Sequence, residues 1–234
     1  MNRRQLFAAG AVLPLIPAVA RADDAADRRL REDWAWLGRY AEENAALKAR
    51  GARTGIVFMG DSITEGWRRQ RPGFFREGRV GRGISGQTTP QMLVRMMGDV
   101  IALKPRAVHI MAGTNDVAGN TGPMTLAQSF DNLAAMATLA RANGIAVILA
   151  NVPPAAAFPW RPGLETIGPI AEINRWIARY ARATRATHVD YGRALGDGRG
   201  GIPAALAADG VHPTDAGYAA MERVLTPVLA KLGV

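Results

Sequence analysis

The sequence of 234 residues contains no cysteine. This absence excludes disulfide bonds, metal sites built on thiolates, and a lipid-modified cysteine at a processing site. Lysine is scarce as well, with only Lys48, Lys104 and Lys231. The arginines behind the formal net charge of +9 are spread along the chain, without a basic block interleaved with aromatic residues. We therefore expect a solvated basic surface and no nucleic-acid partner, with attraction to anionic polysaccharide or lipid headgroups as a lesser alternative.

Long apolar runs are absent except near the N-terminus. The basic start Met1-Asn2-Arg3-Arg4 precedes an apolar run over residues 6–20, and Ala20-Arg21-Ala22 has the small-x-small pattern of a cleavage site. These features predict that residues 1–22 are an export signal peptide. A membrane span is the alternative, but the run has about 15 residues where a span needs ~20, and its two prolines would interrupt a helix.

Two kinds of signal fit this leader. The Arg3-Arg4 pair, shortly before Leu6-Phe7, resembles a bacterial twin-arginine signal, which exports folded proteins, but general-secretion signals also carry two basic residues. Both routes end outside the cytoplasm. The sequence therefore predicts a periplasmic or secreted protein with no stable membrane anchor.

The rest of the chain has the composition of one globular domain. Hydrophobic residues make up 48% of the sequence and charged residues 21%, which is enough to bury a full core and is unlike a disordered chain. Within residues 23–50, apolar side chains recur at helical spacing, at Leu30, Trp34, Leu37, Ala41 and Leu47. This spacing predicts an amphipathic helix over residues 23–50, packed on a main domain of residues 51–234.

Short β-rich apolar runs alternate with longer helical patterns in the main domain. The predicted strands cover residues 55–59, 79–84, 108–112, 145–150 and 187–191. The predicted helices cover residues 89–103, 125–143, 167–185 and 214–232. Strands that alternate with crossover helices form a parallel sheet with helices on both faces, so we expect an α/β fold.

Four short motifs stand at ends of the predicted strands or in a late loop. They are Gly60-Asp61-Ser62, Gly83-Ile84-Ser85-Gly86, Gly113-Thr114-Asn115-Asp116 and Asp209-Gly210-Val211-His212-Pro213. Ligands of parallel α/β sheets bind beyond the carboxyl ends of the strands. We therefore expect the four motifs to meet at one edge of the sheet.

Ser62 is the candidate nucleophile. A serine hydroxyl needs a neighbouring base and a site that stabilises the oxyanion. Ser62 follows the first predicted strand and begins a predicted helix or turn, where its N–H would face developing negative charge. The alternative is that Ser62 only caps this helix.

His212 is the candidate base, because it lies in a loop between Gly210 and Pro213. Asp209, three residues earlier, could accept a hydrogen bond from the imidazole and fix its tautomer. A plain turn at Asp209-Gly210 is the alternative. His109 and His188 lie within apolar strand patterns, and we expect both to be core residues.

Gly86 and Asn115 are candidate oxyanion donors together with the Ser62 N–H. Gly86 has no side chain, so its N–H can approach a bound carbonyl closely, and Asn115 can present its amide NH₂. A turn or helix cap is the alternative role for Asn115.

The four motifs together resemble the conserved blocks of the SGNH or GDSL-type esterase superfamily. The reading Gly-Asp-Ser-Ile-Thr at residues 60–64 is similar to its acetylhydrolase-like branch. The resemblance implies a flavodoxin-like, three-layer α/β/α sandwich with a parallel five-stranded sheet. It also implies Ser62 as nucleophile, His212 as base, Asp209 as its orienting acid, and Ser62, Gly86 and Asn115 as the oxyanion hole. No metal or organic cofactor is needed for this chemistry.

The substrate depends on a long loop over residues 151–168, which is rich in proline and aromatic residues and is a candidate substrate wall. Trp160 and Trp67 could contact a sugar ring or an acyl group, and Arg161 an anionic group, with ordinary packing as the alternative. We expect a small-acyl, acetyl-type esterase acting on carbohydrate or a similar extracellular ester. A lysophospholipase or arylesterase is the main alternative, and an acyltransferase or an inactive binding protein is a further one. The oligomeric state stays open.

Overall fold

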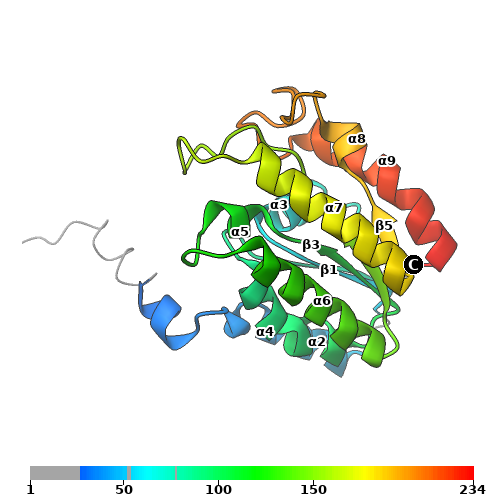
Figure 1. The fold of residues 1–234 in the computed structure, drawn as a ribbon. Coiled ribbons are helices and arrows are strands. Elements are labelled where there is room, and N and C mark those ends of the chain that lie inside the picture. The colour runs from blue at the N-terminus through cyan, green and yellow to red at the C-terminus, as the bar shows by residue number, and fades with distance from the viewer. Residues whose placement is uncertain (1–26, 52–53, 77) are drawn as a thin grey trace, which may run out of the picture. The chain divides into compact units, whose positions relative to one another are not determined.

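The computed structural model describes residues 27–51, 54–76 and 78–234 (Figure 1). The predicted signal peptide therefore lies outside the described residues. The chain divides into two units, residues 1–34 and residues 35–234, and the second unit contains the sheet. Among the described residues, no helix has the length and apolar character needed to cross a membrane.

The main unit is built on five parallel strands. In chain order they are β1 (Ile56–Gly60), β2 (Arg79–Gly83), β3 (Ala107–Met111), β4 (Ala146–Ala150) and β5 (Thr187–Val189). The order across the sheet is β2-β1-β3-β4-β5, and every neighbouring pair is parallel. This is the flavodoxin-like order, in which the chain changes direction between β1 and β3. The predicted α/β/α fold with a parallel five-stranded sheet is confirmed.

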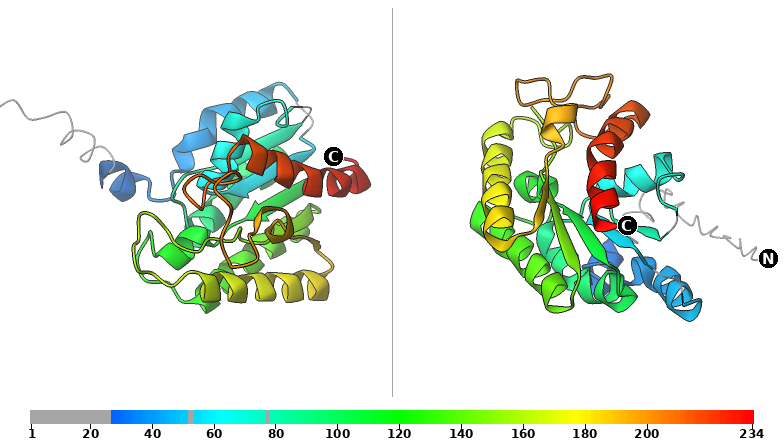
Figure 2. Two further views of the ribbon diagram at one scale, coloured as in Figure 1. Left: turned by 90° about the horizontal axis from the view of Figure 1, so that it is seen from above. Right: turned by 90° about the vertical axis from the view of Figure 1, so that its right-hand side faces the viewer.

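The helices cover both faces of the sheet. The longer ones are α2 (Ala41–Ala49), α3 (Ser62–Gln70), α4 (Thr89–Asp99), α6 (Leu126–Ala142), α7 (Ile167–Thr184) and α9 (Asp215–Leu232). Short helical turns are η1 (Leu37–Tyr40), η2 (Ile101–Leu103), α5 (Thr114–Ala118) and α8 (Gly192–Leu195). In the right-hand view of Figure 2, α7 in yellow and α9 in red lie on opposite sides of the sheet.

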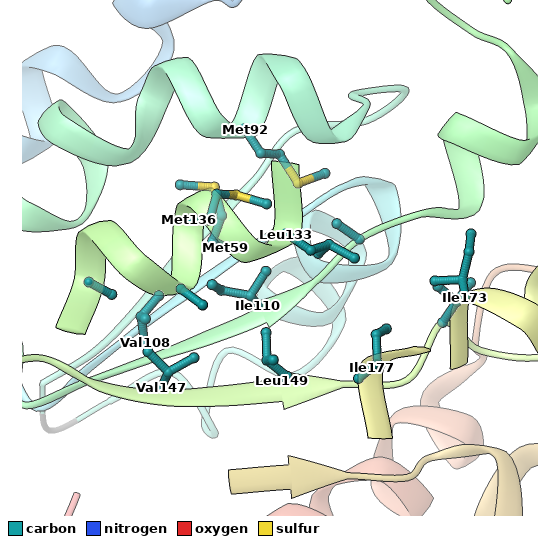
Figure 3. Packing of buried hydrophobic residues seen from close by; sticks show 14 of the residues in the cluster. Met59, Met92, Val108, Ile110, Leu133, Met136, Val147, Leu149, Ile173 and Ile177 are labelled. Carbon is teal, nitrogen blue, oxygen red and sulfur yellow. The ribbon is translucent and has the colours of Figure 1, made fainter. Parts of the chain in front are cut away.

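Successive residues of each strand point to opposite faces, which gives two separate cores. On one face, Val57 and Met59 of β1 pack with Val108 and Ile110 of β3 against α4, α6 and α7. Figure 3 shows this cluster, with methionines from the strand and the helices meeting above the sheet. On the other face, Ile56 and Phe58 belong to the cluster that includes residues of α3 and α9. Strands buried on both faces are apolar throughout, as the sequence of β1 is.

The N-terminal segment differs from the single helix predicted over residues 23–50. Residues 27–32 are helical, and a second helical stretch runs through η1 and α2. Trp36 between them has a left-handed backbone with φ of 53°. This conformation cannot continue an α-helix, so the prediction of one continuous helix is wrong.

Candidate active site

Ser62 stands at the first position of α3, directly after β1. The carboxylate of Asp61 caps this helix by accepting a hydrogen bond from the N–H of Ile63 at 3.0 Å. A side chain at Gly60 would collide with Thr64, since a Cβ there would lie 2.1 Å from the Thr64 hydroxyl. The strand and helix are therefore joined by a tight turn that fixes Ser62 at the carboxyl edge of the sheet.

The structure brings Ser62, His212 and Asp209 together. The Ser62 Oγ lies 2.9 Å from His212 Nε2, and His212 Nδ1 lies 2.6 Å from Asp209 Oδ2. Asp209 Oδ1 also accepts hydrogen bonds from the N–H groups of Val211 at 3.0 Å and His212 at 2.7 Å. The carboxylate thus holds both the imidazole and the loop that carries it.

The electrostatics of this arrangement favour an ionised Asp209. Partial burial raises the pKa of this carboxyl. Hydrogen bonds from the His212 ring and from the N–H groups of His212 and Val211 lower the pKa by more than burial raises it, so it lies below the usual range. A carboxylate beside Nδ1 keeps the proton on that nitrogen, so the Nε2 lone pair faces Ser62. His212 is therefore in the tautomer that can accept the Ser62 proton.

The second motif forms the loop between β2 and α4. Glu65 Oε2 accepts hydrogen bonds from the N–H and the hydroxyl of Ser85, at 2.8 and 2.5 Å. The next residue, Gly86, has a φ of +77°, a left-handed conformation that glycine adopts without strain. Tyr40 donates a hydrogen bond to the carbonyl of Gly83 at the start of this loop. Gly86 is exposed, and its carbonyl accepts a hydrogen bond from Asn120, which follows α5, at 3.3 Å.

Asn115 is buried in α5, and its amide is held at both ends. Its Nδ2 donates to the carbonyl of Gln87 at 3.0 Å, and its Oδ1 accepts from Asn120 Nδ2 at 2.8 Å. An amide nitrogen carries two hydrogens. The bond to Gln87 uses one of them and leaves the other for an incoming oxygen atom.

Comparisons with known proteins identify the family of this chain. The model of the GDSL-like Lipase/Acylhydrolase family matches residues 58–220, which include all four motifs. The chain belongs to this family. It is accordingly a carboxylic ester hydrolase.

Three relatives of this GDSL-like hydrolase show the range of similarity. Esterase TesA of Pseudomonas aeruginosa is 30% identical over 201 residues, which cover 78% of this chain and 89% of TesA. A GDSL-like lipase of Bacteroides thetaiotaomicron is 45% identical with a TM-score of 0.80, covering 85% of this chain and 99% of its own. A proposed acylhydrolase of Bacteroides fragilis is 42% identical with a TM-score of 0.81, covering 86% and 98%.

Asp116, the last residue of the third motif of this hydrolase, anchors the loop to its surroundings. Its carboxylate accepts hydrogen bonds from the N–H and hydroxyl of Thr89 and from the hydroxyl of Ser129 at 3.0 Å. Thr89 begins α4 and Ser129 lies in α6, so Asp116 ties α5 to both helices. Burial raises the pKa of this carboxyl, although the bonds from Thr89 and Ser129 oppose the rise.

Trp160 and Arg161 lie beside the site, whereas Trp67 does not. The Trp160 ring is stacked on Phe158, with centroids 5.0 Å apart, and its centroid lies 5.9 Å from that of His212. Arg161 is exposed, and its guanidinium lies next to Gly119 in the turn that follows α5. Trp67 is fully buried, stacks on Tyr218 and donates from Nε1 to Glu222, so the expectation of a substrate contact there is wrong.

The two other histidines divide between core and surface. His109 is fully buried and within 2.9 Å of the Tyr191 hydroxyl, and burial lowers its pKa to about 3. It is therefore a neutral core residue, as expected. His188 is exposed on the edge strand β5, where Nε2 lies 2.7 Å from Asn151 Oδ1, so its predicted place in the core is wrong.

Three residues that contact the site were missed from the sequence: Glu65, Gln87 and Asn120. Glu65 lies one helical turn after Ser62 and Gln87 directly follows Gly86, so their distances along the chain were the only signal. Asn120 stands in the sequence Ala-Gly-Asn-Thr-Gly, which indicates a turn and nothing more. In the described part of the chain, no group of acidic residues and histidines is arranged to hold a metal ion.

Proposed function

We propose that this hydrolase works through an acyl-enzyme on Ser62. The Ser62 oxygen attacks the ester carbonyl carbon while His212 Nε2 takes the hydroxyl proton. The N–H groups of Ser62 and Gly86 and the amide of Asn115 stabilise the oxyanion. The C–O bond to the alcohol then breaks, and the alcohol oxygen receives the proton from His212.

The second half of the reaction repeats these steps with water. His212 takes a proton from water, and the resulting oxygen nucleophile attacks the acyl carbon of the acyl-enzyme. The bond to Ser62 breaks, Ser62 regains the proton from His212, and the carboxylic acid leaves. Asp209 stays ionised throughout and stabilises the imidazolium that forms in each half.

For the substrate, we propose a small acyl group, acetyl in the first instance, on a carbohydrate alcohol. The observation that carries this proposal is Trp160, which is 39% exposed beside His212 and is backed by the buried ring of Phe158. An exposed aromatic face held rigidly next to the base can stack on a sugar ring, and its flat apolar surface orients the ring. His212 is the group that protonates the leaving alcohol, so the alcohol side of the ester belongs near Trp160.

The openness of the site favours a small acyl group. The side chains of His212 and Asp209 are 38% and 42% exposed. A long acyl chain contributes binding energy only where apolar side chains remove it from water. An open site with a single exposed indole therefore suits a short acyl group on a bulky, polar alcohol better than a lipid.

The test compares acyl length and alcohol type in one protein. The expected result is a kcat/KM that falls from p-nitrophenyl acetate to butyrate to octanoate, together with release of acetate from acetylated polysaccharides. Activity that rises with acyl length, or hydrolysis of lysophospholipids in preference to acetylated sugars, would overturn the substrate proposal. The Ser62→Ala variant serves as the blank in each assay. Product analysis with added alcohols would reveal any acyl transfer.

Trp160 variants separate the sugar contact from the chemistry. Trp160→Ala should raise KM on acetylated oligosaccharides several-fold more than KM on p-nitrophenyl acetate, because only the oligosaccharides have a sugar ring that the exposed aromatic face can contact. Trp160→Phe keeps an aromatic face and should retain most of the oligosaccharide affinity. If Trp160→Ala changed KM equally for the acetylated oligosaccharides and for p-nitrophenyl acetate, the proposed sugar contact would be contradicted.

We also propose that Arg161 contacts an acidic group on the substrate when one is present. Its exposed guanidinium beside Gly119 lies close to the site, and a guanidinium binds carboxylates with two parallel hydrogen bonds. Arg161→Gln should weaken binding of acetylated oligosaccharides that carry uronic acids and leave neutral ones unchanged. An equal effect on both would rule this contact out.

The leader at residues 1–22 supports export of this enzyme, on its sequence pattern alone. We propose that the substrate is met outside the cytoplasm. A reporter fused to residues 1–30 should be exported, and Arg3→Lys with Arg4→Lys should stop export if the twin-arginine route is used. Cytoplasmic retention of the unaltered fusion would contradict the proposal.

A further inference from the structure

Asn120 connects the loops that surround the site. It follows α5, in a turn between Gly119 and Gly122, both of which have positive φ. Its Nδ2 donates to Asn115 Oδ1 at 2.8 Å and to the carbonyl of Gly86 at 3.3 Å. Its Oδ1 accepts from Trp160 Nε1 at 3.3 Å. The Asn120 side chain therefore contacts Asn115 and Gly86, which are two of the proposed oxyanion donors, and also Trp160, the proposed sugar contact.

We infer that Asn120 is a positioning residue that sets the oxyanion hole. The inference rests on the proposed function, because it assumes that Asn115 and Gly86 donate to the oxyanion. The side-chain amide of asparagine can rotate by half a turn, which exchanges the positions of its oxygen and its nitrogen. Asn120 presents a donor to Asn115, which holds the oxygen of Asn115 on that side and its nitrogen toward Gln87 and the substrate.

Asn120 restrains Gly86 in a second way. Glycine has the widest backbone freedom, and the N–H of Gly86 is useful only if its loop keeps one conformation. Glu65 holds Ser85 on one side of this glycine, and Asn120 holds the Gly86 carbonyl on the other. The hydroxyl of Thr121, next to Asn120, lies 2.9 Å from the Thr88 hydroxyl and adds a further contact between the same two loops.

The position of Asn120 sets its role apart from that of a packing residue. Its side chain is exposed, so a smaller residue there leaves no buried cavity. Its backbone N–H donates to the carbonyl of Asn115, a bond that survives any non-proline substitution. The turn should therefore form without the Asn120 side chain, but the Asn115 amide should no longer be held in one orientation.

The link to Trp160 joins substrate binding to this arrangement. Trp160→Phe keeps the ring and removes the Nε1 donor, so Asn120 would lose one of the bonds that fix its own orientation. We expect Trp160→Phe to lower kcat by about threefold to tenfold on p-nitrophenyl acetate, a substrate with no sugar to stack, because small misplacements of catalytic groups slow the reaction.

The experiment measures kcat and KM on p-nitrophenyl acetate for Asn120→Ala, Asn120→Asp and Asn115→Ala, each scaled to the active-site concentration from end-point labelling with a fluorophosphonate. Asn120→Ala should lower kcat about tenfold or more with KM within about twofold, because small misplacements of catalytic groups cost up to about 100-fold. Asn120→Asp should lower kcat further. A carboxylate has no hydrogen to donate, so its oxygens would repel Asn115 Oδ1 and the Gly86 carbonyl oxygen. Asn143→Asp, an exposed change at the end of α6, is the matched control and should leave kcat unchanged.

A coupling measurement tells positioning apart from a general loss of folding. In the Asn115→Ala background, Asn120→Asp should lower kcat much less than it does in the wild type, because only its contact with Gly86 remains to be lost. Independent, multiplying effects would overturn the inference, and so would an unchanged kcat for both Asn120 variants while Asn115→Ala lowers it. If Asn115→Ala itself leaves kcat unchanged, the proposed oxyanion role fails first, and this inference fails with it.

Discussion

The Ser62 hydroxyl and His212 Nε2 lie 2.9 Å apart, although 150 residues separate them in the chain. One connection between their elements is the Tyr218 hydroxyl in α9, which donates to the Ile63 carbonyl in α3 at 2.9 Å. The two helices that flank the reacting groups are thus bonded directly to each other. The pair is positioned by the fold and not by proximity along the sequence.

Asp209→Asn tests the proposed role of the acid. The amide oxygen can still accept from the N–H groups of Val211 and His212, so the loop should keep its shape. The amide NH₂ would face Nδ1 and force the proton onto Nε2, where it blocks transfer from Ser62. We expect kcat on p-nitrophenyl acetate to fall by about 10³–10⁴-fold with little change in melting temperature. A loss below tenfold would show that Asp209 does not set the tautomer.

Gly83→Ala tests the packing of the second motif. A Cβ at this position would lie 2.2 Å from the backbone nitrogen of Glu65 and 2.7 Å from the Asp61 carbonyl oxygen, so α3 would have to move. We expect a loss of unfolding free energy of about 3 kcal/mol or more, at the upper end of overpacking costs.

The control for that change is Gly98→Ala in α4, where a Cβ would meet nothing within 4 Å. Alanine in a helix is favoured over glycine by about 0.5–1 kcal/mol, so this variant should be slightly more stable. Urea unfolding of both variants provides the comparison. Equal stability of the two would contradict the close approach of β2 and α3.

Asp61→Asn tests the pH dependence of stability. Burial raises the pKa of Asp61 to about 6, with the hydrogen bond from Ile63 and the nearby His212 lowering it and Asp116 raising it. The folded state therefore holds a proton that the unfolded chain has already lost, and stability from this group falls as the pH rises from about 4 to 6. Asparagine cannot ionise and keeps an oxygen for the Ile63 N–H.

The measurement is urea unfolding of the wild-type protein and Asp61→Asn at pH 4.5 and pH 8. As the pH rises from 4.5 to 8, the unfolding free energy of the variant relative to that of the wild type should increase by on the order of 2 kcal/mol, because each pKa unit corresponds to about 1.4 kcal/mol. A constant difference between the two proteins would show that Asp61 ionises in the folded state as it does in the unfolded chain.

Arg95→Met tests the buried ion pair of Arg95 and Asp99, which lies close to the second motif. The Arg95 guanidinium bonds to Asp99 at 2.8 Å, to the Gln87 side chain at 2.6 Å and to the Arg82 carbonyl at 2.6 Å. Arg95→Met leaves a buried carboxylate without its partner, which costs about 3–5 kcal/mol. Adding Asp99→Asn removes the charge and should recover part of that loss in urea unfolding. Additive losses in the double variant would contradict the pairing.

The sheet and the reacting groups were predictable because each has a local signature. Apolar runs such as that of β1 are buried on both faces, and their spacing identifies the parallel strands. Ser62 and Asn115 lie in motifs that directly follow β1 and β3, and His212 lies in the last loop before α9. These positions predict that the three residues meet at one edge of the sheet. Their distances confirm this convergence for Ser62 and His212.

Other features depend on which face an element turns inward, and the sequence does not show this. Trp67 points into the core because α3 packs that side on Tyr218 of α9. His188 is exposed because β5 is short and lies at the edge of the sheet. The left-handed backbone of Trp36 and the contacts of Asn120 arise from turn geometry and long-range hydrogen bonds, which leave no periodic pattern.

The nucleophile is tested most directly by peptide mapping after labelling with a fluorophosphonate. A serine activated by a neighbouring base reacts with this reagent, whereas ordinary serines do not. We expect one adduct, on Ser62, with parallel loss of ester hydrolysis, and neither adduct nor activity in Ser62→Ala. An adduct on another residue, or a Ser62→Ala variant that still hydrolyses p-nitrophenyl acetate at a rate comparable to the wild type, would contradict the proposed mechanism.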